Sequence, residues 1–147
     1  MKHRLLLTVI AGTALVALTG CTSYTGIAAI QRAADARDDL PANVKSSDPD
    51  MPSNYRLLVE DADVRYLGAE SQDHSVVCVA AVPALKPDQW VIGCSDGIIN
   101  DREIVTVSHI GQPTVKLVTD NFDTQALESE GWRKIHSNVL VGRVLAF

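Results

Sequence analysis

Aromatic residues are scarce in this chain of 147 residues, which has two tryptophans, three tyrosines and two phenylalanines. Trp90 and Trp132 therefore supply most of its large aromatic mass. A tryptophan serves either as a binding platform or as part of a core. With so few aromatic side chains available to fill a core, the sequence favours the core for both.

The chain also lacks an excess of positive charge and the length of a large enzyme. Its 13 basic and 18 acidic residues give a net charge of −5. An acidic surface repels phosphate groups, which argues against a nucleic-acid partner. A (β/α)₈ barrel needs roughly 250 residues and is excluded. The length fits one domain plus a tether.

One long hydrophobic run is present, at the N-terminus. Lys2 and Arg4 precede a predominantly apolar stretch from Leu5 to Leu18, which is typical of a secretory signal and marginal for a membrane span. A retained transmembrane anchor is the alternative. The stretch contains no twin-arginine signal, because the basic region holds a single arginine.

The residues that follow this run, Leu18-Thr19-Gly20-Cys21, resemble the lipobox of bacterial lipoproteins. The resemblance disfavours the transmembrane anchor and implies a signal peptide over residues 1–20. It implies cleavage before Cys21, a diacylglycerol on the Cys21 thiol and a further acyl chain, such as palmitate, on the new amino group. Loss of Lys2 and Arg4 would leave a mature net charge of −7. Two or three acyl chains give lasting attachment.

The lipobox resemblance also implies a location, on the outer face of a bacterial cytoplasmic membrane or in the periplasm. The membrane is then a partner through the lipid anchor. This compartment permits disulfides.

Residues 21–53 are predicted to be a tether. Ile27 to Leu40 is rich in Ala, Arg and Asp, and places Ile27, Ile30 and Ala34 on one helical face, so we expect a helical spacer over 27–40 that ends at Pro41. The next residues are rich in Pro, Ser, Asp and Asn, which is typical of a linker. A flexible tether of this size spans roughly 30 Å.

Residues 54–147 carry short β-branched runs separated by turns, which predict strand pairs. The first pair flanks Asp61-Ala62, with Leu57 opposite Tyr66 and Val59 opposite Val64. The third pair places Val107 opposite Val115 and Val105 opposite Leu117. The last pair is Trp132–Ile135 with Val139–Val144, after one or two helical turns over Thr124–Glu130 that Gly131 closes. We therefore predict a mainly β fold, an antiparallel meander or curled sheet with an N-terminal helical spacer.

The second strand pair, Ser75–Val82 with Gln89–Ser95, bears on the cysteines. With Cys21 lipidated, Cys78 and Cys94 remain. Pairing Val82 with Trp90 places Cys78 opposite Cys94, within reach of a disulfide. A redox-active pair usually takes the form Cys-x-x-Cys, which is absent. Two cysteines do not complete a tetrahedral metal shell. A structural disulfide is expected.

The sequence Gly93-Cys94-Ser95-Asp96-Gly97 matches the Gly-x-Ser-x-Gly nucleophile elbow of α/β-hydrolases. The elbow needs a strand before the serine and a helix after it. The residues before the next predicted strand are too few for that helix, and Cys94 is expected in a disulfide. Downstream, Asp120 and His136 meet the required order only trivially. A Ser-Asp-Gly turn is the better interpretation.

The remaining polar groups show no metal-binding pattern. His74, His109 and His136 lie in or beside predicted turns without a ligand spacing, and are expected at the surface. Four acidic residues between 120 and 130 lack the order of a calcium loop and its glycine. They predict a solvated loop. No cofactor is expected.

The stretch from Ala34 to Val141 resembles a group of small actinobacterial envelope proteins with no established activity. The resembling pieces are Asp39-Leu40-Pro41, Tyr55-Arg56-Leu57-Leu58, Val77-Cys78-Val79, Trp90 to Ser95, Gly131-Trp132-Arg133 and Asn138 to Val141. The resemblance implies no catalytic residue and supports the Cys78–Cys94 bridge.

Two functions compete on these observations. The first is a non-catalytic envelope module, tethered by lipid, that binds a protein, glycan or small ligand or has a structural role. The second is a small extracytoplasmic hydrolase that uses Ser95. The first is favoured, because Ser95 lacks the helix, fold and partners of a nucleophile, whereas an anchor joined to a compact β domain suits display.

Overall fold

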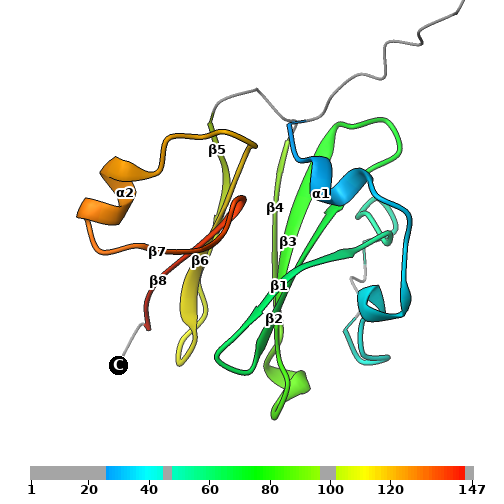
Figure 1. Cartoon of the computed structure of the whole chain (residues 1–147). Coiled ribbons are helices and arrows are strands. Elements are labelled where there is room, and N and C mark those ends of the chain that lie inside the picture. The colour runs from blue at the N-terminus through cyan, green and yellow to red at the C-terminus, as the bar shows by residue number, and fades with distance from the viewer. Residues whose placement is uncertain (1–25, 45–47, 97–101, 145–147) are drawn as a thin grey trace, which may run out of the picture.

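Eight antiparallel strands in two sheets form the framework of the structure, a computed structural model that describes residues 26–44, 48–96 and 102–144 (Figure 1). The first sheet contains β1 (Arg56–Asp61), β2 (Val64–Glu70), β3 (Val76–Pro83) and β4 (Val91–Asp96). The second contains β5 (Glu103–Val107), β6 (Pro113–Val118), β7 (Arg133–His136) and β8 (Val139–Val144). The helices are α1 (Ala28–Gln31), α2 (Gln125–Ser129) and the 3₁₀ turns Ala36–Asp38 and Pro87–Gln89.

The expected mainly antiparallel β fold is confirmed. The first sheet is a meander in the order β1-β2-β3-β4. The second has the order β5-β6-β8-β7, so β8 lies between β6 and β7. The predicted helical turn before β7 is present as α2, and Gly131, with a φ of +97°, follows it. This short helix carries the chain to the outer edge of the sheet before β8 returns to the centre.

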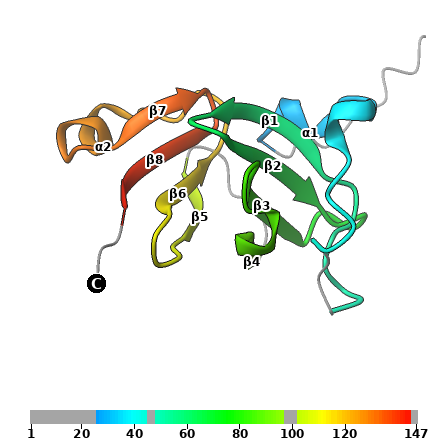
Figure 2. The same cartoon turned by 90° about the horizontal axis from the view of Figure 1, so that it is seen from below.

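The two sheets face each other across the main core (Figure 2). Alternate residues of each strand point into this core, as expected for half-buried strands. Its members from the first sheet are Leu58, Tyr66, Val77, Val79 and Ala81, and from the second Ile104, Val105, Val107, Val115, Leu117, Val139 and Val141. An ion pair between Arg133 and Asp61, with N–O distances of 3.1 and 2.5 Å, joins β7 to β1 at one edge.

Gly93 brings β4 and β5 together at the other edge. A Cβ built at Gly93 would lie 2.8 Å from Val107 Cβ, closer than carbon atoms can pack. We expect Gly93→Ala to lower the free energy of unfolding by about 1–3 kcal/mol, the usual penalty for overpacking. Urea unfolding measures the change. Ser108→Ala, on an exposed residue beyond β5, is the control and should leave stability unaltered; equal stabilities for both variants would contradict the close approach.

The predicted pairings of the two middle hairpins are confirmed. Val107 pairs with Val115 and Val105 with Leu117. In the second hairpin Cys78 pairs with Cys94, and β4 begins one residue after Trp90.

The predicted register of the first hairpin is wrong. Leu57 pairs with Leu67, and Val59 with Tyr66. The turn residues are Ala62 and Asp63, with φ angles of +47° and +60°, rather than Asp61 and Ala62. Two consecutive positive φ values characterise the type I′ turn that matches strand twist. A register shift between Leu57 and Val59 adds to the displacement.

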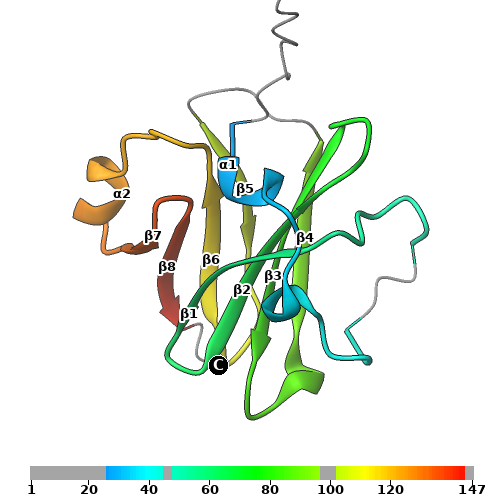
Figure 3. The same cartoon turned by 45° about the vertical axis from the view of Figure 1, so that its right-hand side comes forward.

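The helical spacer expected over 27–40 is also wrong. α1 is a single turn that lies at one end of the two sheets (Figure 3). Ile27 and Ile30, 0% and 4% exposed, belong to the main core, and Ile30 packs directly over Gly68. The apolar face of residues 27–40 is too narrow to stabilise an isolated helix. Ile27 and Ile30 are instead buried against the sheets. Residues 26–44 are thus packed on the β domain rather than forming a tether.

Candidate functional site

The first sheet is apolar on both faces, and its second face is covered by residues 40–44 and 48–55, which we call the strap. In Figure 1 the second sheet lies on one side of the first sheet and this segment lies on the other. β3 is buried along nearly its whole length, because its side chains meet the main core and the strap alternately. The cluster under the strap contains Val44, Tyr55, Leu67, Ala69, Cys78, Ala80 and Val82.

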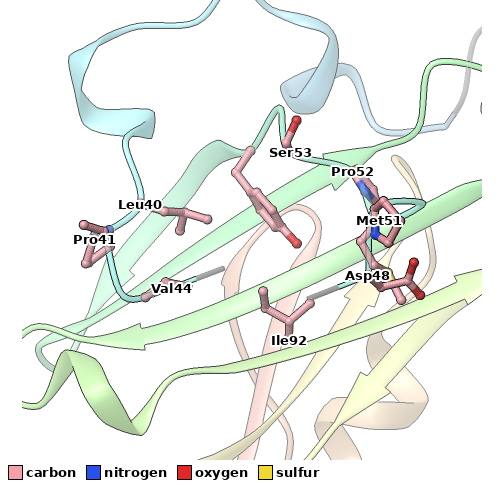
Figure 4. A pocket seen from close by; sticks show the side chains of 11 residues that line it. Leu40, Pro41, Val44, Asp48, Met51, Pro52, Ser53 and Ile92 are labelled. Carbon is pink, nitrogen blue, oxygen red and sulfur yellow. The ribbon is translucent and has the colours of Figure 1, made fainter. Parts of the chain in front are cut away.

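A cavity of about 460 Å³ lies between the strap and the first sheet (Figure 4). This volume is within the usual range for small-molecule sites. Figure 4 shows Leu40, Pro41 and Val44 on one side of the cavity, Met51 and Pro52 opposite them, and Ile92 across from the strap. Ala42, Asp48, Pro49, Ser53 and Tyr55 complete the lining.

Tyr55 brings a buried polar atom to this lining. The residue is 5% exposed, and its hydroxyl has no hydrogen-bond partner. Burial raises the pKa of Tyr55 to about 12, so the hydroxyl keeps its proton at neutral pH and remains a donor. Buried polar groups are nearly always hydrogen-bonded, and an exception calls for an explanation.

The other polar groups of the cavity lie at its rim. Asp48 and Ser53 are exposed, whereas Val44, Pro52 and Tyr55 are buried. Asp48 Oδ1 accepts a hydrogen bond of 2.9 Å from the backbone N–H of Asp50. None of the described lining residues is a lysine, arginine or histidine. Among these residues, the buried ones other than Tyr55 are apolar, and the one carboxylate lies at the mouth.

The expected disulfide lies beside the cavity. Cys78 and Cys94 are bonded across β3 and β4, with their Cα atoms 4.1 Å apart. Met51 of the strap lies against them, its Sδ 3.2 Å from Cys94 Sγ. Because disulfide sulfurs carry no hydrogen, this is a packing contact between sulfur atoms. The disulfide thus supports the face of the sheet on which the strap lies.

Ser95 does not occupy a nucleophile elbow. It lies inside β4, paired with Val77, and not at a strand-to-helix turn. The last glycine of the motif, Gly97, lies outside the described residues. In the described part of the chain, no hydrogen bond joins the Ser95 hydroxyl to a histidine or carboxylate. Asp120 Oδ2 accepts from Ala28 N at 2.8 Å, which places this carboxylate in the attachment of α1.

The three histidines of the described residues are separated from one another and make local contacts. His74 Nδ1 lies 2.8 Å from Oε1 of Glu70, a buried carboxylate that also accepts from Gln31. His109 is exposed and contacts a neighbouring carbonyl. His136 is half-buried, and burial lowers its pKa. Over residues 26–44, 48–96 and 102–144, no three His, Cys, Asp or Glu side chains gather as a metal site would require.

Two residues of the acidic stretch, Asp123 and Glu128, make contacts at the start of α2. Asp123 accepts a hydrogen bond of 3.0 Å from Gln125 N, and Glu128 accepts one of 2.5 Å from the Thr124 hydroxyl. Carboxylates near a helix N-terminus satisfy its free N–H groups. These side chains therefore have a local structural role.

The sequence favoured the core for both tryptophans, and the structure shows both only half-buried. Trp90 is half-buried and packs against the cluster under the strap. Trp132 is half-buried over Gly142, where a Cβ would meet its ring at 3.0 Å. Lys116 Nζ lies 4.6 Å from the Trp132 ring centroid. Each tryptophan is therefore partly covered by the domain and partly open to solvent, which suits its amphipathic character.

Sequence reasoning missed the cavity and the role of Tyr55. The prolines of the strap are typical of a linker, yet Leu40, Val44 and Met51 recur between them. Apolar residues at such intervals in a linker were the available signal, because a solvated tether has no use for them. Cys21 and the predicted signal peptide lie outside the described residues.

Comparisons of the chain with models of protein families, with curated proteins and with solved structures found no match. Among the helices of the described residues, none combines the length and the apolar character needed to span a bilayer. Functional inference therefore rests on the sequence motif at Cys21 and on the geometry of the cavity.

Proposed function

We propose that the protein is a lipid-anchored extracytoplasmic lipoprotein whose β domain is a non-catalytic binding module of the cell envelope. The observation that carries the binding role is the cavity of about 460 Å³ beneath the strap. Small-molecule sites are typically concave and mostly apolar with a few placed polar groups, and this cavity has that composition. The Leu18-Thr19-Gly20-Cys21 sequence supports the anchor.

The domain lies close to the membrane in this proposal. Gly26 already belongs to the packed domain, since its carbonyl accepts a 2.5 Å hydrogen bond from Asp120 N. It follows Cys21 by five residues, and a fully extended chain of that length reaches about 17 Å. The α1 end therefore faces the lipid headgroups. The strap, expected to act as a tether, instead covers the cavity.

The anchor is tested by metabolic labelling with an alkyne-bearing palmitate in a bacterial host that processes lipoproteins. We expect the wild-type chain to be cleaved and labelled, and Cys21→Ser to be neither, because the modified thiol is absent. Cys78→Ser is the matched control, which should be processed and labelled like the wild type. Normal processing and labelling of Cys21→Ser would disprove lipidation at this residue.

The non-catalytic assignment is tested with a panel of ester and peptide substrates. We expect no turnover by the wild type above that of Ser95→Ala, because Ser95 lies within an antiparallel strand rather than at an exposed turn. Turnover that disappears in a folded Ser95→Ala variant would establish the hydrolase.

A pull-down from envelope extract with the tagged, unlipidated mature chain tests the binding role alongside. A specific protein, glycan or small-molecule partner supports the binding module. Absence of both a partner and turnover would contradict it and favour a purely structural role.

A further inference from the structure

We infer that the cavity beneath the strap binds a small uncharged apolar molecule with a hydrogen-bond acceptor, to which the Tyr55 hydroxyl donates. This inference rests on the proposed binding function and specifies the chemical class of the ligand. It is carried by the unpartnered hydroxyl of a residue that is 5% exposed and lines the cavity.

The Tyr55 hydroxyl calls for an acceptor that the chain does not supply. A phenol can both donate and accept, and a buried phenol normally does at least one. A single water molecule is a poor substitute, because a buried water needs two to four polar partners. Apart from Tyr55, the buried residues among the described lining are Val44 and Pro52, and both have apolar side chains. A carbonyl or ether oxygen on an apolar body would satisfy the hydroxyl and fill the remaining space.

The charge of the lining favours an uncharged ligand. The described lining residues include one carboxylate, Asp48 at the rim, and no basic side chain, so none of them would compensate a negative group inside the cavity. A cation placed in the apolar interior would lose its hydration without a buried carboxylate to replace it. The exposed position of Asp48 keeps the acidic group at the mouth.

The probe that tests this inference is 6-propionyl-2-(dimethylamino)naphthalene, an uncharged fluorescent ketone whose emission reports the polarity of its surroundings and hydrogen bonding to its carbonyl. The protein is the mature chain from residue 21 with Cys21→Ser, so that no lipid competes for the dye. We expect saturable binding with a blue-shifted emission. 2-(Dimethylamino)naphthalene, which lacks the ketone, should bind about tenfold more weakly, as for the loss of one hydrogen bond.

Three variants connect the binding to Tyr55 and to the cavity. Tyr55→Phe should weaken ketone binding about tenfold, with little effect on the ketone-free dye, because it removes the donor and keeps the ring. Tyr66→Phe is the matched control, since Tyr66 is 1% exposed but belongs to the core between the sheets. Its dye affinities should equal those of the parent. Ala42→Trp, on an exposed residue of the lining, should fill the cavity and abolish binding of both dyes.

Several results would overturn the inference. They are an absence of saturable ketone binding, equal ketone affinity in Tyr55→Phe, full affinity in a folded Ala42→Trp variant, or tighter binding of the anionic dye 1-anilinonaphthalene-8-sulfonate than of the ketone. Circular dichroism and urea unfolding establish that each variant is folded. The dye assay uses unlipidated protein, so it is independent of the labelling experiment. Absence of dye binding would contradict the proposed ligand but not the lipid anchor, and absence of labelling would contradict the anchor but not the ligand.

Discussion

Replacing both Cys78 and Cys94 with alanine is expected to lower the free energy of unfolding by about 3 kcal/mol. The disulfide closes a loop with a sequence separation of 16 residues. In the chain-entropy model, a crosslink over such a loop restricts the unfolded ensemble and stabilises the folded state by that amount. Urea unfolding, monitored by tryptophan fluorescence, measures the change.

Two comparisons isolate the contribution of the disulfide. Treatment of the parent protein with a reducing agent should reproduce the loss in stability, and the oxidised protein should weigh two hydrogens less than the reduced form. Cys21→Ser, which removes a cysteine outside the described domain, should unfold at the same urea concentration as its unlipidated parent. Equal unfolding midpoints for oxidised and reduced protein would show that the bridge does not stabilise the fold.

The placement of this bridge illustrates what the sequence could predict. The hairpin that contains it has two apolar strands that both begin and end at clear turn residues. Within such a hairpin, one correct pair determines every other pair, because side chains alternate between the two faces. Pairing around the Pro83–Asp88 loop therefore brought Cys78 opposite Cys94, and the same reasoning brought Val107 opposite Val115.

The first hairpin shows where this reasoning fails. Asp61, Ala62 and Asp63 are all acceptable turn residues, and none is a glycine that would identify the positions with positive φ. The sequence pattern therefore does not decide whether the two central turn residues are Asp61 and Ala62 or Ala62 and Asp63. The observed turn at Ala62 and Asp63 moves the register and brings Leu57 opposite Leu67 instead of Tyr66.

Local sequence patterns could not predict that the N-terminal segment and the strap pack on the β domain. Their composition is polar or rich in proline, and each alone predicts a spacer or linker. Their burial depends on a feature that no local pattern shows, which is that both faces of the first sheet are apolar and one would otherwise lie open. Tertiary packing therefore decided the structure of residues 26–44 and 48–55, including the cavity.

A buried carboxylate holds part of this segment to β1, and its loss is our last prediction. Asp38 is 7% exposed. Its carboxylate accepts hydrogen bonds from both terminal nitrogens of Arg32, from Asp35 N at 2.8 Å and from Leu57 N at 2.7 Å. The Arg32 guanidinium and these N–H groups hold the pKa of Asp38 well below its usual range. Asp38 thus ties the 3₁₀ turn, α1 and β1 together.

We expect Asp38→Asn to lower the free energy of unfolding at pH 7 by about 3 kcal/mol, because it leaves Arg32 without its buried partner. Asp39→Asn, on the exposed neighbouring residue, is the matched control and should change stability by less than about 0.5 kcal/mol. Urea unfolding of both variants and the parent measures these differences.

The pH dependence separates the charge of Asp38 from its shape. Because folding lowers the pKa of this carboxyl, its stabilising contribution is fully present above the pKa of the unfolded chain, about 3.9, and declines as the pH falls below it. The parent should therefore lose stability between pH 5 and pH 3 more steeply than Asp38→Asn, whose amide does not titrate in that range. The gap between the two unfolding curves should narrow as the pH falls. A constant gap across this range would show that Asp38 acts through packing alone.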